Sequence, residues 1–293
     1  MPSFCDFDRD GDLDLFIVTY RHYREGGLPE TAGYQGNGRA EVLEEYKKYY
    51  TVRTTLRGGK KRHQITTYGR DDYLLRNNGN GTFTNVTSAA GLDGHGVGLA
   101  ATWWDYNADG WPDLYVCNDF DDPDRFYRNN RDGTFTDVLL ETVPHTPWFS
   151  MGADAADLNN DGMIDFLAAD MSATTHYKEK TTMGAMNPAR LASVAGPPPQ
   201  YMRNSLYLNT GTGRFMEAAY LAGLADSDWS WSVKLADLDN DGRVDVFISN
   251  GMTRNFNNSD TPTHSAMLKG RSNWDIYRNT PTMPERNLAF RNE

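Results

Sequence analysis

The stretch Asp105-Tyr-Asn107-Ala-Asp109-Gly110-Trp111-Pro-Asp113 occurs in four versions along the chain. The other three cover residues 6–14, 157–165 and 237–245, and all four follow the pattern D-x-[DN]-x-D-G-x-x-D without gaps. The copies are unequally spaced. We therefore expect a structural unit of roughly 50 residues that carries insertions of varying length.

Each copy, called an Asp loop below, has the same kind of neighbours. Upstream of three copies the residues alternate between large and small, as over 97–103, which predicts a β-strand. Downstream of every copy comes a short apolar run such as 114–117, which predicts a strand packed on both faces. A hairpin follows, with a glycine turn as at 132–133. The unit is therefore four short antiparallel strands, with the Asp loop between the first and the second.

Units of four strands repeated at this length predict an all-β fold, a β-propeller of four-stranded antiparallel blades. We expect a single propeller over 1–293, with blade A at about 1–90 (insertion 20–71), blade B at about 95–142, blade C at about 147–222 (insertion 171–203) and blade D at about 228–293 (insertion 251–286). Closed propellers have roughly 4–8 blades. Because the last hairpin stops inside its turn, we expect an incomplete ring that is part of a longer polypeptide.

The Asp loops have the donor chemistry of calcium sites. Side-chain oxygens at positions 1, 3, 5 and 9 can converge because glycine at position 6 permits a tight turn, and the position-7 carbonyl can add another oxygen. Hard oxygen ligands select Ca²⁺ over zinc or copper. About four sites are predicted, with these ligand residues: Asp6, Asp8, Asp10, Asp12, Asp14; Asp105, Asn107, Asp109, Trp111, Asp113; Asp157, Asn159, Asp161, Met163, Asp165; Asp237, Asp239, Asp241, Arg243, Asp245.

The EF-hand is the competing calcium motif, and it does not fit. It needs a bidentate glutamate at position 12, where this chain has Ile17, Val116, Ala168 and Ile248. Protein groups fill every predicted ligand position, so the calcium is expected to be structural rather than catalytic. Four bound Ca²⁺ would change the net charge from −11 to about −3, and we expect the metal-free protein to be less stable.

Composition excludes several other classes. A net charge of −11 argues against nucleic acid as a partner. No apolar run reaches the length of a membrane span, and the N-terminus lacks signal-peptide architecture. The two cysteines, Cys5 and Cys117, form neither a zinc motif nor a disulfide framework, and their pairing is left open.

The loops and hairpins resemble the FG-GAP/VCBS repeats of integrin-α-like propellers. The chain as a whole is similar to bacterial VCBS-repeat proteins related to cartilage acidic protein and to ASPIC/UnbV proteins. The segments that carry this second likeness are Asp170-Met171, Pro199–Asn204, Asp228–Trp231 and Asn250–Arg254, whereas 21–70 matches weakly. The resemblance implies an extracellular or cell-surface propeller that is stabilised by calcium and binds proteins or glycans, with no established catalytic activity.

The insertions indicate where a ligand would bind. All three fall between the second and third strands of their units, so we expect them on one face, opposite the Asp loops, where binding usually resides. Residues 21–70 contain eleven Lys and Arg but five Glu, with a short helix predicted over 40–50. Such a basic surface could hold an anionic polysaccharide or an acidic protein. The plainer interpretation is that residues 21–70 form a solvated surface insertion that binds no ligand.

The leading hypothesis is a non-enzymatic adhesion or carbohydrate-binding module on the cell surface or outside the cell. A polysaccharide lyase or hydrolase that uses the insertion face is the alternative, although no local motif marks a catalytic base or a carboxylate pair. A third hypothesis is a purely structural segment of a larger adhesin.

Overall fold

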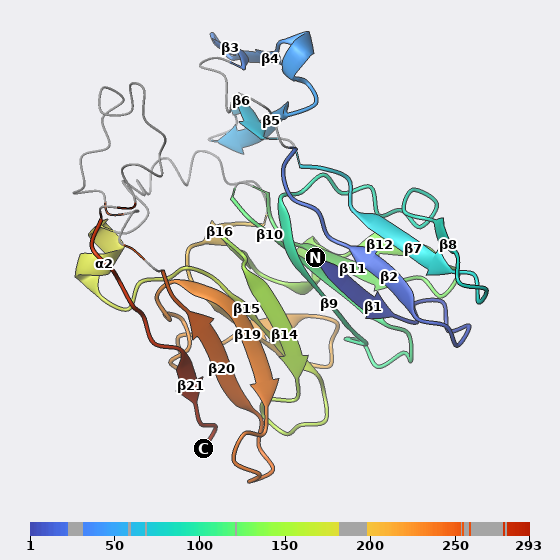
Figure 1. The fold of residues 1–293 in the computed structure, drawn as a ribbon, viewed down its shortest axis with the longest axis vertical. Helices are drawn as coiled ribbons and strands as arrows, with labels where there is room; N and C mark the ends of the chain where they lie inside the picture. Colours follow the sequence, from blue (N-terminus) through green and yellow to red (C-terminus); the bar gives the residue numbers. More distant parts are fainter. Residues whose placement is uncertain are drawn as a thin grey trace.

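A computed structural model of the protein describes residues 1–22, 32–57, 60–67, 69–120, 122–181, 198–252, 254, 258, 278 and 280–293. The regular secondary structure of the described part is almost all β-strand (Figure 1). Most of the predicted insertion at 251–286, and residues 182–197 of the one at 171–203, lie outside the described residues.

The chain forms four antiparallel sheets, each called a blade. In every blade the Asp loop connects the first strand to the second. Blade A comprises β1 (Pro2–Cys5), β2 (Asp14–Ile17), β7 (Tyr73–Asn77) and β8 (Phe83–Asn85). Blade B comprises β9 (Gly98–Trp104), β10 (Asp113–Asn118), β11 (Arg125–Asn129) and β12 (Phe135–Asp137). Blade C comprises β14 (Gly152–Ala156), β15 (Asp165–Ala169), β17 (Ser205–Asn209) and β18 (Phe215–Glu217). Blade D comprises β19 (Ser230–Ala236), β20 (Asp245–Asn250) and β21 (Leu288–Phe290).

The blades are arranged as an incomplete β-propeller. The first strands β1, β9, β14 and β19 pack next to one another in that order. Figure 1 shows the sheets side by side, from blade A in blue to blade D in orange and red. The approach between blades A and B is close: a Cβ on Gly98 would lie 2.2 Å from Cγ2 of Val18. Glycine is therefore needed at that point of β9.

The hydrophobic core lies between the blades, as the apolar runs predicted. Along β10, Leu114 and Val116 belong to a buried cluster with Phe16 of blade A. Tyr115, on the opposite face of the same strand, belongs to a second cluster with Phe166 of blade C. Every residue of β10 is buried. Burying one large apolar side chain contributes about 1.5–3 kcal/mol, so the second strands hold neighbouring blades together.

The connection from β2 to β7 forms two hairpins instead of a helix. β3 (Gly33–Gly36) pairs with β4 (Arg39–Val42), and β5 (Tyr50–Arg57) pairs with β6 (Lys60–Thr67) over eight residues. The predicted helix over 40–50 is wrong, since only Glu44–Tyr46 form a 3-10 turn. Cross-strand pairing of the β-branched run in β5 prevails over the weak helical preference of the segment before it.

The remaining elements are short. β13 (Thr146–Pro147) pairs in parallel with β16 (Gln200–Tyr201). The α-helices are α1 (Leu139–Thr142) and α2 (His176–Thr181). Across the described residues, no helix has the length and apolar character that a membrane crossing requires. Cys5 and Cys117 are both free thiols.

Candidate metal sites in the Asp loops

Local backbone geometry is the same in all four Asp loops. The position-6 glycines have φ between 85° and 96°, a conformation that L side chains rarely adopt, so glycine is required there. Position 4 also has positive φ, between 56° and 59°, in the left-handed region that other residues can enter at some cost. The position-4 residues are Arg9, Ala108, Asn160 and Asn240.

The aspartate at position 1 holds this turn closed. Its Oδ1 accepts a hydrogen bond from the position-5 amide at 3.0–3.1 Å, and its Oδ2 accepts one from the position-6 amide at 2.7–3.1 Å. These residues are Asp6, Asp105, Asp157 and Asp237. A carboxylate with two amide donors is fixed in orientation before any cation binds.

The aspartate at position 9 begins the second strand and is buried in every blade. Its Oδ2 accepts from the position-2 amide at 3.0–3.2 Å. Its Oδ1 accepts at 2.7–2.9 Å from the amide of an asparagine at the end of the third strand or, in blade D, two residues beyond it. The acceptors are Asp14, Asp113, Asp165 and Asp245, and the donors are Asn77, Asn129, Asn209 and Asn292.

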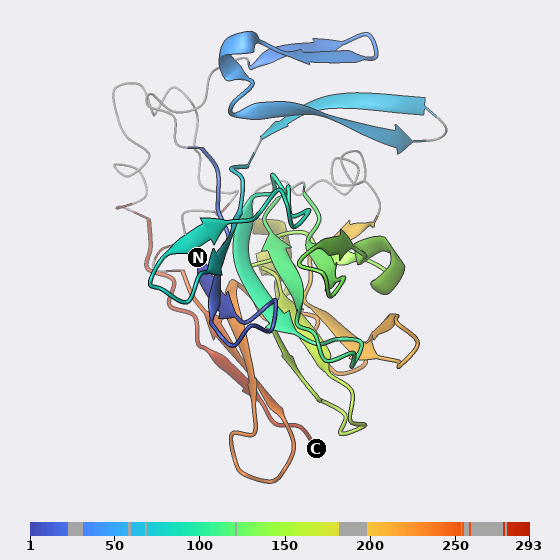
Figure 2. The ribbon, with the colours of Figure 1, turned by 90° about the vertical axis from the view of Figure 1, so that its right-hand side faces the viewer.

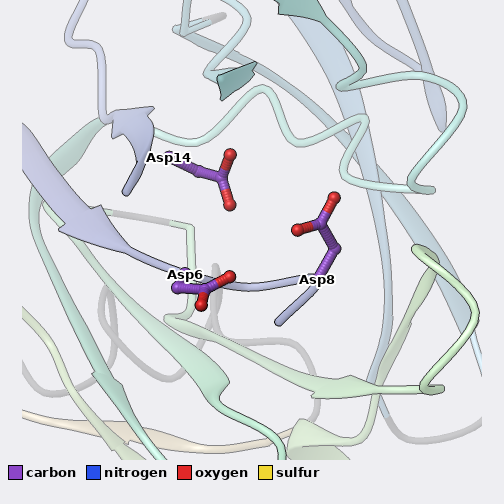
Figure 3. A group of neighbouring side chains, drawn as sticks. All are labelled: Asp6, Asp8 and Asp14. Carbon is purple, nitrogen blue, oxygen red and sulfur yellow. The ribbon is translucent and has the colours of Figure 1, made fainter. Parts of the chain in front are cut away.

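Three carboxylates converge in the two loops that have aspartate at position 3. One carboxylate oxygen from each of Asp6, Asp8 and Asp14 lies within 4.8 Å of the other two. Figure 3 shows these three side chains turned toward a common centre. Asp237, Asp239 and Asp245 form the equivalent group in blade D. In blades B and C position 3 is Asn107 or Asn159, and each accepts a hydrogen bond from the position-5 amide at 3.1 Å.

The aspartate at position 5 accepts hydrogen bonds from within its own blade. Its Oδ1 accepts from the position-7 amide at 2.9–3.0 Å in all four loops. In two loops its Oδ2 accepts from an arginine of the same blade, Arg131 to Asp109 at 2.9 Å and Arg291 to Asp241 at 3.1 Å. In blades A and D the structure therefore brings the carboxylates of positions 1, 3 and 9 together, and in blades B and D an arginine bonds position 5. The role of position 5 as a ligand stays a prediction.

Burial makes the position-9 carboxylates of blades A and B, Asp14 and Asp113, costly to ionise without a cation. It raises the pKa of Asp14 to about 6, helped by the nearby charges of Asp8 and Asp10 and opposed by two backbone amides. Burial likewise raises the pKa of Asp113 to about 7. For Asp109, burial would raise the pKa, but hydrogen bonds from Arg131 and from the Trp111 amide bring it below its ordinary value. A hard cation would offset the repulsion, and a donor set made only of oxygen fits calcium.

The sequence analysis missed the role of the third-strand asparagines. Besides donating its amide, each uses Nδ2 to bond the position-8 carbonyl of its own loop at 3.1–3.3 Å. In three blades Nδ2 also reaches the position-2 carbonyl of the preceding blade, from Asn129 to Phe7 at 2.9 Å, for example. The signal was an asparagine at the same place in every hairpin.

A second recurring pair lies at the other end of each blade. The residue just before the third strand accepts a hydrogen bond from the backbone amide that ends or follows the second strand, at 2.7–2.9 Å. These acceptors are Asp72, Asp124, Asn204 and Asn287. They brace the end of the blade from which the insertions emerge, and the sequence analysis did not single them out.

The two hairpins between β2 and β7 project from the end of the propeller opposite the Asp loops (Figure 2). Arg53 of β5 lies 3.9 Å from Asp122 of blade B, measured from Nη1 to Oδ1. Of the eleven Lys and Arg over residues 21–70, seven are exposed: Arg39, Lys47, Lys48, Lys60, Lys61, Arg62 and Arg70. Arg24 lies outside the described residues. The hairpins therefore carry an exposed basic surface above an acidic propeller.

Comparison with known proteins identifies the repeat. A model of the FG-GAP-like repeat matches residues 65–116, 105–168 and 192–248. No curated protein matches the chain at a significant level. Among solved structures, the chain is similar to an Agrocybe aegerita lectin described for its recognition of non-reducing terminal N-acetylglucosamine, with 18% identity and a TM-score of 0.33. That likeness covers 85% of this chain and 60% of the lectin, and it is too low to bear on the ligand.

Proposed function

The chain belongs to the FG-GAP-like repeat family, and from that premise we propose that it is an extracellular or cell-surface binding module whose blades are stabilised by calcium. FG-GAP-like repeats fit a binding or adhesion role. The observation that carries the calcium part is the fourfold recurrence of one loop geometry, with the same amides bonded to the same carboxylates.

Electrostatics supports a cation in these loops. The converging carboxylate oxygens lie within 4.8 Å of one another, and two charges at that limit repel by roughly 3–4 kcal/mol at an effective permittivity of 20 and by about 1 kcal/mol in water. Positions 1 and 9 are already oriented by amides, so calcium would bind without rebuilding the turn. In loops of this kind Asp6, Asp8 and Asp14 would hold the ion in blade A, with equivalent residues in the other blades. Extracellular calcium modules bind at about 10⁻⁴–10⁻³ M, which suits a role outside the cell.

Calorimetric titration with Ca²⁺, together with thermal unfolding in Ca²⁺ and in EDTA, tests this part. We expect three to four bound ions and a lower melting temperature in EDTA. Asp8→Asn is the matched control for Asp8→Ala, because blades B and C already use asparagine at that position. The asparagine variant should retain its site and the alanine variant should lose one ion. Fewer than three ions, or no effect of EDTA, contradicts the calcium proposal.

The basic hairpins support a ligand that is acidic. Lys60, Lys61 and Arg62 at the turn and on β6 are exposed, and a concentrated positive surface attracts anionic polysaccharide or acidic protein. We infer that this surface, rather than the Asp loops, meets the partner, because the loops are occupied by their own structural contacts. Ligands of this kind would bind more weakly as salt is raised.

Binding to a sulfated or uronic-acid polysaccharide, measured at two salt concentrations, tests the ligand part. The variant Lys61→Glu should bind about tenfold more weakly or worse. Arg214→Glu is the control, since Arg214 is also exposed but lies in the turn from β17 to β18, at the Asp-loop end. Equal losses in both variants would mean a response to net charge alone. Sustained cleavage of the polysaccharide would favour an enzyme over a binding module.

A further inference from the structure

A cavity of about 300 Å³ lies between the Asp loops of blades B and C. Its walls include residues of both loops and of the turn from β17 to β18, namely Asp105, Tyr106, Ala108, Gly162, Met163 and Gly211. Blades B and C are both four-stranded, so the walls come from two neighbouring repeats with every strand in place. A cavity of about 150 Å³ is large enough for benzene, so this one has room for a planar group of that size.

The equivalent place between blades A and B holds a guanidinium group. Arg9, at position 4 of the blade A loop, donates from Nη1 to the carbonyl of Gly110 at 3.0 Å. Its guanidinium carbon lies 5.6 Å from the centre of the Trp111 ring, close enough for a cation–π contact. Gly110 and Trp111 are positions 6 and 7 of the blade B loop. The chain therefore shows, between its own blades, how an arginine side chain is held in such a place.

Smaller side chains leave this place open between blades B and C. Position 4 of the blade B loop is Ala108, and position 7 of the blade C loop is Met163. Position 6 shows the result directly. A Cβ on Gly162 would meet nothing within 4 Å, whereas one on Gly110 would lie 3.3 Å from Nη1 of Arg9. The space beside Gly162 is therefore open where the space beside Gly110 holds a guanidinium group.

The charges around the cavity favour a cation. In blade B, Arg131 of the hairpin turn bonds the position-5 carboxylate of Asp109 at 2.9 Å. The same place in the blade C turn is Gly211, and the position-5 carboxylate of Asp161 accepts from the neutral side-chain amide of Asn159 at 2.9 Å instead. The blade C loop contains three aspartates and no basic residue, so it stays negative with one Ca²⁺ bound. An added guanidinium group would offset that charge.

We propose that this cavity binds an arginine side chain of a ligand. Its guanidinium group takes the place that Arg9 has between blades A and B, donating to the Gly162 carbonyl and lying beside Met163. Ala108 and Gly162 are exposed, so the cavity can be entered from solvent. Arg214 of the same turn is exposed and is not part of the cavity wall. The site takes a basic group, so it is separate from the hairpin surface, and its geometry does not require calcium.

The probe is N-acetyl-arginine amide, titrated into the full chain in saturating Ca²⁺ and followed by the NMR signals of the backbone amides. The matched compound is N-acetyl-citrulline amide, which has nearly the same shape as the arginine compound but no charge. We expect the amide signals of Ala108, Gly162 and Gly211 to shift saturably with the arginine compound, and at least tenfold weaker binding of the citrulline compound. Equal binding of the two compounds, or no saturable shift at these amides, overturns the proposal.

Ala108→Arg supplies the guanidinium group from the chain itself and should abolish binding of the probe. Asn240→Arg is the matched control, because Asn240 is also an exposed position-4 residue with positive φ, and it should leave binding unchanged. Gly211→Arg copies Arg131, whose φ of 67° is close to the 68° of Gly211. It should weaken binding at least tenfold by bringing in a like charge, and it keeps the test decisive if Ala108→Arg does not fold. Undiminished binding in a folded cavity variant contradicts the proposal.

Discussion

Replacing Asn129 by alanine removes the hydrogen bonds that join blade B to blade A. Nδ2 of Asn129 bonds the Phe7 carbonyl at 2.9 Å and the Pro112 carbonyl at 3.2 Å, and Oδ1 accepts from the Arg131 amide at 2.9 Å. Asn129 is 2% exposed. Leaving the buried Phe7 carbonyl without a partner costs about 1–3 kcal/mol, and the two bonds within the blade add about 1 kcal/mol. The variant should therefore lose about 3 kcal/mol.

Asn77 is the internal control for this prediction. It makes the same two contacts within its own blade, to the Leu13 carbonyl at 3.1 Å and from the Gly79 amide at 3.1 Å, and among the described residues it bonds no other blade. Asn77→Ala should cost about 1 kcal/mol. The difference between the variants reports the contact between blades together with the greater burial of Asn129, because the contacts within the blade are the same.

Urea unfolding in saturating Ca²⁺ measures both variants. The free energies of unfolding of the two variants can be compared if each has the same slope against urea concentration as the unchanged chain. A loss of 3 kcal/mol should lower the melting temperature by about 5 °C for a chain of this size. If the two variants lie within about 0.5 kcal/mol of each other, the asparagine does not link the blades and the reasoning is wrong.

Two further predictions follow from burial. Burial raises the pKa of Asp124 to about 7, although hydrogen bonds from Tyr115, Asn118 and Ser150 oppose the rise. The pKa in the unfolded chain is near 3.8, so the folded state binds the proton more tightly. The free energy of unfolding should therefore fall by up to about 4 kcal/mol as the pH rises from 4 through 7. Urea midpoints at pH 5 and pH 8 check this, and the change should shrink in Asp124→Asn; an undiminished change would place its origin elsewhere. Phe215→Ala should cost about 3–5 kcal/mol by leaving a core cavity, whereas Phe83→Ala, at a position 45% exposed, should cost less than about 1 kcal/mol. Similar losses in both would show that the neighbouring blade contributes little to holding these rings.

The all-β propeller and its repeating strands were predictable because their signals are local. A strand packed on both faces needs apolar residues at every position, and 114–117 has them. The helix predicted over 40–50 failed for the converse reason. Its two ends pair with strands elsewhere, Glu41 with Tyr34 and Tyr50 with Thr67, and no periodicity within the segment reveals those partners.

In the candidate calcium sites, too, some features depend on contacts within the loop and others on residues far away in the sequence. Nine consecutive residues suffice to specify which oxygens can converge, because the turn is closed by hydrogen bonds within the loop, such as that from Gly110 to Asp105 at 2.7 Å. The turning of Asp109 toward Arg131, in contrast, depends on a hairpin 22 residues away. The calcium itself stays a prediction for titration to test.

Local spacing thus determined the Asp loops, the strands and the repeat, since each rests on contacts between residues close in the chain. Tertiary structure alone decided how the blades are joined. The bonds from Asn129, Asn209 and Asn292 to the preceding loop span 103 to 134 residues. Their partners become neighbours only when blade stacks on blade, because burial of the apolar second strands brings together segments that no local pattern relates.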